Sequence, residues 1–120
     1  MQTLKVVARL FPLVESGEKT STIRWREHRI EPGLMTYVCE GDDCRSAVVR
    51  VTKCTDMPLS EAATFLGRQE EWPDAVMLEG MREHYPEIEL TSIVQVVEHL
   101  SPAETSALRE ASDQDKPTGA

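Results

Sequence analysis

Residues 17–26 read Gly-Glu-Lys-Thr-Ser-Thr-Ile-Arg-Trp-Arg and gather side chains that can take part in polar chemistry. A turn-forming glycine precedes Lys19, and hydroxyl residues and arginines follow it. Lys19 stands three residues before Thr22, so at a junction between a loop and a strand its amine can reach that hydroxyl. Pairs of a lysine and a hydroxyl serve acyl transfer, in which the amine activates the oxygen for attack. The spacing therefore indicates a candidate nucleophilic site.

From Thr20 onward the same stretch alternates as a β-strand does. One predicted face carries hydroxyls and guanidinium groups: Thr20, Thr22, Arg24 and Arg26. The other face includes Ile23 and Trp25, which we expect in the core. An edge strand with a solvated polar face would show the same pattern, because charged residues are mostly exposed. Spacing alone leaves both interpretations open.

The motif Gly-x-Lys-Thr-x-Thr-x-Arg, formed by Gly17, Lys19, Thr20, Thr22 and Arg24, resembles the signature of ASCH-domain proteins. These are small β-barrel domains related in fold to the RNA-binding PUA domain. Further similarity lies in a central strand at 49–52, a helical insertion at 59–86 and a closing strand at 93–100. The resemblance spans residues 4 to 100 and implies an α+β, PUA-like fold. Such a fold is a partly closed β-barrel of about five to six strands with two helices inserted before the last strand.

Within that family the chain is most similar to the small bacterial amidohydrolases that remove the acetyl group from N(4)-acetylcytidine. The resemblance implies that Thr22 is the nucleophile and Lys19 the general base. The third family residue is a glutamate of the helical insertion, which donates a proton to the departing amine. Counting back from the Tyr85-Pro86 pair places Glu70 there, with the adjacent Glu71 as the alternative.

The predicted substrate-binding residues are Arg24, Thr20 and Arg26. A lysine acts as a base only when it is neutral, and partial burial together with the positive charge of Arg24 would favour that state. Residues 25–29 are bulkier and more basic than we expect of the amidohydrolase branch, so they can rim a pocket. Trp25 could stack on a base, but strand alternation favours a place in the core.

Other ASCH domains are thought to bind or cut RNA, so two alternatives stay open: a non-catalytic RNA-binding or regulatory module, and a ribonuclease. The net charge of -8 argues against a general nucleic-acid binder, which would carry a basic footprint. Residues 1–30 nevertheless hold six Lys/Arg against three Glu, whereas residues 56–89 hold nine acids against two arginines. This distribution suits a small-molecule nucleoside substrate or a short piece of RNA.

Length and composition predict one domain in a cytoplasmic, monomeric protein. No apolar run approaches the roughly 18 residues of a membrane span, and the N-terminus lacks the apolar segment of a signal peptide. Cys39, Cys44 and Cys54 are an odd number for a disulfide framework and fit no zinc motif. We therefore expect reduced thiols, no metal, no cofactor and no membrane association. His28, His84 and His99 are expected at the surface or in packing roles.

Hydrophobic periodicity and turn residues predict the remaining elements. Strands are expected at 4–8, 34–40, 46–55 and 93–97, and helical segments at 10–15, 60–66 and 73–83. Ser60 is the predicted cap of the helix that ends at Gly67. The helix at 73–83 has its predicted apolar positions at Ala75, Val76, Met77, Met81 and Tyr85.

The domain is expected to occupy residues 1–100, followed by a short helix and a disordered tail in 101–120. Ser101 and Glu104 have the spacing of a capping box, which predicts a helix from there to about Ala111. Residues 112–120 are polar and include Pro117 and Gly119, which favours disorder.

Overall fold

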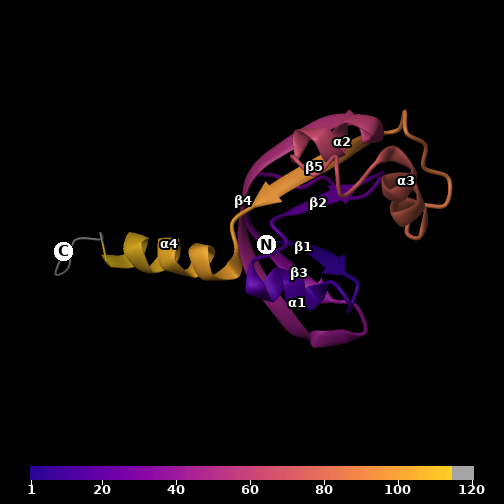
Figure 1. Ribbon diagram of the computed structural model, residues 1–120. Helices are drawn as coiled ribbons and strands as arrows, with labels where there is room; N and C mark the ends of the chain where they lie inside the picture. The colour runs from indigo at the N-terminus through magenta and orange to yellow at the C-terminus, as the bar shows by residue number, and fades with distance from the viewer. Residues whose placement is uncertain (115–120) are drawn as a thin grey trace. The chain divides into compact units, whose positions relative to one another are not determined.

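The computed structural model describes residues 1–114 as an α+β fold (Figure 1). Its elements run in the order β1 (Gln2–Val6), α1 (Phe11–Ser16), β2 (Ser21–Arg24), β3 (Gly33–Cys39), β4 (Asp42–Pro58), α2 (Leu59–Phe65), α3 (Asp74–Arg82), β5 (Ile93–His99) and α4 (Pro102–Gln114). The expected α+β class and the two helices before the last strand are confirmed.

The five strands form one mixed sheet in the order β1-β3-β4-β5-β2. β1 runs parallel to β3, with Leu4 opposite Tyr37, and β3 runs antiparallel to β4, with Met35 opposite Val49. A tight hairpin joins β3 to β4, and its glycine, Gly41, has a φ of 88°. A positive φ is easily adopted only by glycine, which explains the residue at this turn.

The chain divides into two compact units. The first unit comprises Met1–Ser21, Ile30–Lys53 and the described chain from Glu98. The second unit comprises Thr22–Arg29 and Cys54–Val97. No helix within residues 1–114 is long and apolar enough to cross a membrane.

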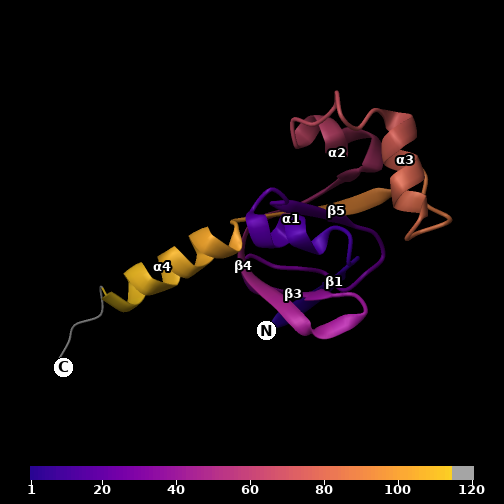
Figure 2. The same ribbon diagram turned by 60° about the horizontal axis from the view of Figure 1, so that its bottom comes forward.

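In the core of the first unit, the buried residues alternate along the strands and lie on one face of helix α1. Its fully or almost fully buried hydrophobic side chains come from β1, α1, β3, β4 and the segment before β3: Leu4, Val6, Phe11, Val14, Ile30, Met35, Tyr37, Cys39, Val49 and Val51. Figure 2 shows α1 beside β1 and β3, and α4 extending away from these strands. Thr105 is buried in the first turn of α4, and its hydroxyl accepts a hydrogen bond from the backbone N–H of Arg50 at 2.9 Å.

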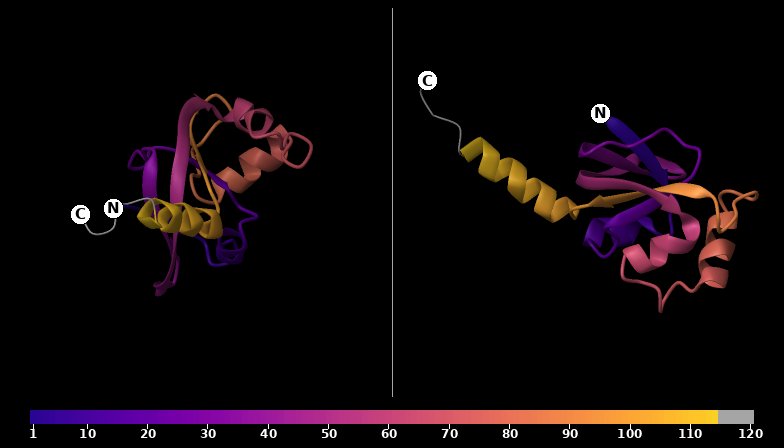
Figure 3. Two further views of the ribbon diagram at one scale, coloured as in Figure 1. Left: turned by 90° about the vertical axis from the view of Figure 1, so that its left-hand side faces the viewer. Right: turned by 90° about the horizontal axis from the view of Figure 1, so that it is seen from above.

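The core of the second unit joins α2, α3 and β5, and Figure 3 shows the two helices next to each other. Its buried members are Leu59, Ala62, Ala63, Met77, Ile88, Val94 and Val96. The predicted core face of α3 is wrong in part, because Ala75 and Val76 are exposed. Ile88, beyond the end of that helix, is fully buried in the same core cluster as Met77.

Both helix-start predictions can be compared with the structure. Ser60 does not cap α2, because the helix begins one residue earlier at Leu59 and its N-cap position is Pro58. The capping box at α4 is confirmed, since the Glu104 N–H donates to Ser101 Oγ at 3.0 Å and the Ser101 N–H donates to Glu104 Oε1 at 3.2 Å. α4 continues to Gln114, three residues beyond the predicted end. Of the predicted disordered tail, residues 115–120 lie outside the described residues.

The end of α1 is fixed by Gly17. Its φ of 86° lies in the left-handed region, and its N–H donates to the Val14 carbonyl at 3.2 Å. A Cβ added at this position would lie 2.9 Å from the Cβ of Ser101. Ser101 is held in place by its capping box, so it has little room to move. Gly17 is therefore required both by its backbone conformation and by a close approach.

Gly17→Ala should lower the free energy of unfolding by about 2–4 kcal/mol, the sum of left-handed strain and overpacking. Gly41→Ala is the matched control, because Gly41 has a φ of 88° and nothing lies within 4 Å of its added Cβ. The control should lose only the strain, about 1–2 kcal/mol. Urea denaturation of both variants measures the difference. If both variants lost the same free energy of unfolding, the close approach of Gly17 to Ser101 would not contribute to stability.

His99 and Tyr37 form a buried polar pair in the first unit. His99 Nδ1 lies 2.8 Å from the Leu100 carbonyl oxygen, which can only accept, so Nδ1 carries the proton. Nε2 then accepts a hydrogen bond from the Tyr37 hydroxyl at 2.8 Å. Burial, and to a smaller extent the positive charge of Lys19, hold the pKa of His99 below its usual value, against the opposing effect of the Leu100 hydrogen bond. The imidazole is accordingly neutral at pH 7.

Because the pKa of His99 is lower in the folded than in the unfolded chain, the unfolded state binds the extra proton more readily. The free energy of unfolding should therefore fall as the pH drops below about 6.5, the usual value for histidine. His99→Gln cannot titrate but can still accept from Tyr37, so it should lose less melting temperature between pH 7.5 and 5.5 than the wild type. His84 is exposed and supplies the control. His84→Gln should lose as much melting temperature between pH 7.5 and 5.5 as the wild type does. If His99→Gln lost as much melting temperature as the wild type, His99 would not be the group that lowers stability at acid pH.

Candidate functional site

Lys19 is held against the beginning of β2. Its backbone N–H donates to the Leu13 carbonyl at 2.9 Å, which attaches it to the end of α1. Its side chain is half-buried, and Nζ donates to the Ser21 carbonyl at 2.6 Å. After the turn at Gly17, the side chain of Lys19 thus lies against the first residue of the strand that follows.

Thr22 is buried, with 5% of its surface exposed, whereas Thr20 is exposed. The burial of Thr22 excludes a solvated face at that position, while its contact with Arg24 agrees with the predicted sharing of one strand face. Its Oγ1 accepts a hydrogen bond from Arg24 Nε at 2.9 Å. A hydroxyl that accepts from a guanidinium keeps its own proton available for a base, and the positive charge favours negative charge on the oxygen. These are properties that a nucleophilic hydroxyl needs.

Arg24 connects this hydroxyl to the next segment of the second unit. Its side chain is 14% exposed, and Nη1 lies 3.6 Å from Glu27 Oε2. β2 ends at Arg24, and Arg26 has a φ of 55°. The predicted alternation is therefore wrong beyond Arg24, because the left-handed backbone at Arg26 ends the strand geometry.

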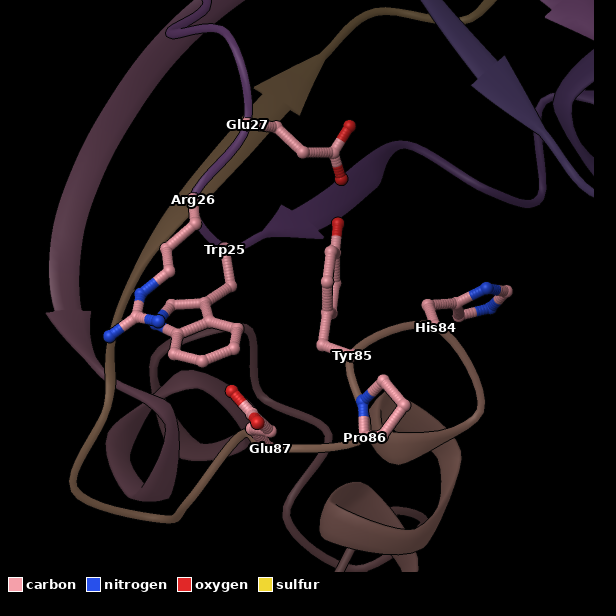
Figure 4. Close-up of a pocket in the computed structure, with 7 residues that line it drawn as sticks. All are labelled: Trp25, Arg26, Glu27, His84, Tyr85, Pro86 and Glu87. Carbon is pink, nitrogen blue, oxygen red and sulfur yellow. The ribbon is translucent and has the colours of Figure 1, made fainter.

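A pocket of about 390 Å³ begins immediately after β2. Its lining comes from two segments of the second unit: Trp25, Arg26, Glu27, His84, Tyr85, Pro86 and Glu87 (Figure 4). The rings of Trp25 and Tyr85 meet edge to face, with centroids 6.0 Å apart and planes at 82°. Pockets for small ligands commonly measure about 300–1,000 Å³ and combine aromatic walls with a few polar groups. The volume of this pocket lies in that range, and two of its lining side chains are aromatic.

Arg26 lies over the indole of Trp25, with its guanidinium carbon 4.2 Å from the ring centroid. Trp25 also packs against the core of the second unit, so the predicted core position is confirmed in part. The sequence indicated that residues 25–29 can rim a pocket, and Trp25, Arg26 and Glu27 of that segment line this one. His84, Tyr85 and Glu87 were not predicted as a site, although the Tyr85-Pro86 pair marked this segment in the sequence.

Glu70, the predicted proton donor, is exposed in the connection between α2 and α3. The alternative, Glu71, pairs with Arg68 at 3.0 Å, and the Arg68 guanidinium also lies over the Trp72 ring. The ion pair of Glu71 makes Glu70 the better candidate of the two, and its catalytic role stays a prediction.

The possible metal ligands of the described chain are dispersed. Within residues 1–114, no group of three or more His, Cys, Asp or Glu side chains is arranged to hold a metal ion. Cys39 is buried, Cys44 exposed and Cys54 half-buried, and none of the three is in a disulfide.

Comparison with known proteins gave no match: no family model, no characterised protein and no solved structure was found to be similar to this chain.

Proposed function

We propose that this protein is an amidohydrolase that removes the acyl group from N(4)-acetylcytidine or a related acylated cytosine nucleoside without a metal ion. Thr22 is the nucleophile, Lys19 the general base and Glu70 the proton donor. One observation carries the proposal: the buried Thr22 hydroxyl accepts a hydrogen bond from Arg24. A buried threonine hydroxyl needs only one partner to be satisfied, and a guanidinium is an uncommonly strong donor for that purpose.

The first half of the reaction forms an acyl-threonine. Lys19, after its cationic amine has released a proton to water, takes the proton from Thr22 Oγ1 while that oxygen attacks the amide carbon. The guanidinium of Arg24 stabilises the negative charge that develops on the tetrahedral intermediate. The C–N bond then breaks, and protonated Glu70 gives its proton to the departing cytosine amine.

The second half restores the enzyme. Water attacks the acyl-threonine ester and passes one proton to the Glu70 carboxylate. Thr22 leaves as the ester collapses and recovers its proton from the protonated Lys19. The net change is one amide and one water converted to one carboxylic acid and one free amine, with each catalytic group returned to its starting state.

The direct test is incubation of the purified protein with N(4)-acetylcytidine, with cytidine release followed by chromatography. Thr22→Val should lower kcat/KM by about a thousandfold or more, because the nucleophile is lost. Thr22→Ser keeps a hydroxyl and should retain measurable turnover. Absence of cytidine release by the folded wild-type protein would defeat the proposed function.

Lys19→Arg should reduce kcat by about a hundredfold or more, since a guanidinium cannot be deprotonated at working pH and so cannot act as a base. Lys53→Arg is the matched control at an exposed position of β4 and should keep wild-type kinetics. The measurement is kcat for both variants, with circular dichroism to establish that each is folded. Near-normal turnover by Lys19→Arg would show that the lysine is not the base.

Salt dependence separates this proposal from RNA binding. A protein that binds RNA through phosphates releases counterions, so its affinity falls steeply with salt. An uncharged nucleoside has no phosphate contact, and kcat/KM should change by less than about threefold between roughly 50 and 200 mM salt. Tight, salt-sensitive binding of single-stranded RNA without nucleoside turnover would favour the RNA-binding module.

A further inference from the structure

The pocket after β2 combines aromatic rings with negative charge. Its lining includes the rings of Trp25 and Tyr85 and the carboxylates of Glu27 and Glu87, together with the guanidinium of Arg26. Figure 4 shows the Tyr85 hydroxyl directed toward Glu27 and the Glu87 carboxylate directed toward the Trp25 side of the pocket. The face of an aromatic ring carries partial negative charge and attracts cations, and a nearby carboxylate adds to that attraction. The lining therefore suits a cation better than an anion.

The chain already places one of its own cations on the Trp25 ring. The guanidinium carbon of Arg26 lies 4.2 Å from the ring centroid, well inside the range of about 6 Å for a cation–π contact. Arg26 is exposed, and its φ of 55° is uncommon for an arginine. Backbone of this kind costs free energy and clusters at ligand sites. The Trp25 face thus accepts a cation, and the exposed side chain that covers it can be displaced.

Glu87 can supply the counter-charge for such a ligand. Among residues 1–114, no hydrogen bond or ion pair engages the Glu87 carboxylate, whereas Glu27 already lies 3.6 Å from Arg24. A primary ammonium has three N–H donors, and ring faces would leave some of them without an acceptor. A fully alkylated ammonium has no N–H group and so avoids that cost. Quaternary ammonium groups are the ligands that aromatic cages of this composition recognise.

We propose that this pocket binds the quaternary ammonium group of a small organic cation, which displaces Arg26 from the face of Trp25 and uses Glu87 as its counter-charge. The volume of about 390 Å³ is that of a small-molecule site and leaves room for a substituent on the nitrogen. The net charge of -8 favours the approach of a cation. Neither Lys19 nor Thr22 lines this pocket, so the proposal does not depend on the amidohydrolase reaction.

The test compares choline with its neutral carbon analogue, in which a tert-butyl group replaces the trimethylammonium group. Trp72→Phe leaves Trp25 as the only tryptophan, so an NMR titration of the indole N–H resonance follows one site. The Kd of choline should be lower than that of the analogue by about tenfold or more, because the two have the same shape and differ in charge. Equal Kd values, or no shift up to about 10 mM choline, would overturn the proposal.

The wild-type protein supplies a second measurement that needs no substitution. The methyl protons of choline should shift upfield when the ammonium group lies over the face of an aromatic ring, and the methyl protons of the neutral analogue should shift much less. An equal shift for both compounds would overturn the requirement for a cation.

Two variants test the assigned contacts. Glu87→Gln should weaken choline binding by about threefold or more, whereas Glu79→Gln, which removes the same charge outside the pocket, should not. Arg26→Asn should tighten choline binding by about threefold or more, because an intramolecular competitor is lost and asparagine tolerates the left-handed backbone. Arg29→Asn also removes an exposed arginine and should have no such effect. Unchanged binding in Glu87→Gln, or unchanged or weaker binding in Arg26→Asn, would overturn the assigned contacts.

The last comparison separates a small molecule from a protein as the source of the ammonium group. A peptide that carries trimethyllysine should bind no more than about threefold tighter than choline, because the pocket recognises the group that both share. A larger gain would show that the peptide backbone is recognised and would overturn the small-molecule assignment. Choline has no amide to hydrolyse, so its binding and the hydrolysis of N(4)-acetylcytidine are measured separately, and failure of one does not defeat the other.

Discussion

The turn at Gly17 is the constraint on which the candidate site depends. It ends α1 in a left-handed conformation and brings the backbone against Ser101, the residue that caps α4. The chain then holds Lys19 to the Leu13 carbonyl and enters β2 two residues later. A bulkier residue at this turn would move the start of β2, and with it the lysine. One glycine thus serves helix termination, helix capping and the position of a candidate base.

The sequence predicted the fold best where neighbouring residues alone determine the local structure. The Ser101–Glu104 capping box has a direct physical reason at that position, and the prediction agrees with the structure. Ser60 is not the cap because the helix begins at Leu59, one residue before it, with Pro58 at the N-cap position. Cap chemistry identifies a helix start only to within a few residues.

The candidate site was harder to predict because it depends on contacts between distant segments. Alternation along β2 treats Thr22 and Trp25 as members of opposite faces. In the structure Thr22 is buried, and Trp25 both packs in the core and lines a pocket. The strand geometry ends before Arg26, and a hydrophobic pattern does not predict the left-handed backbone of this residue. Tyr85 and Glu87 join the site only because the segment after α3 returns beside this bend.

Arg24 contacts two side chains of its own segment at the same time. A guanidinium has five N–H groups in a fixed plane, so it can donate to several partners at once. Here Nε donates to the Thr22 hydroxyl and Nη1 lies near the Glu27 carboxylate, which lines the pocket. A lysine at this position would offer a single point of charge and could not hold both groups in this fixed geometry. The arginine of the motif is therefore suited to orient the Thr22 hydroxyl and the Glu27 side of the pocket together.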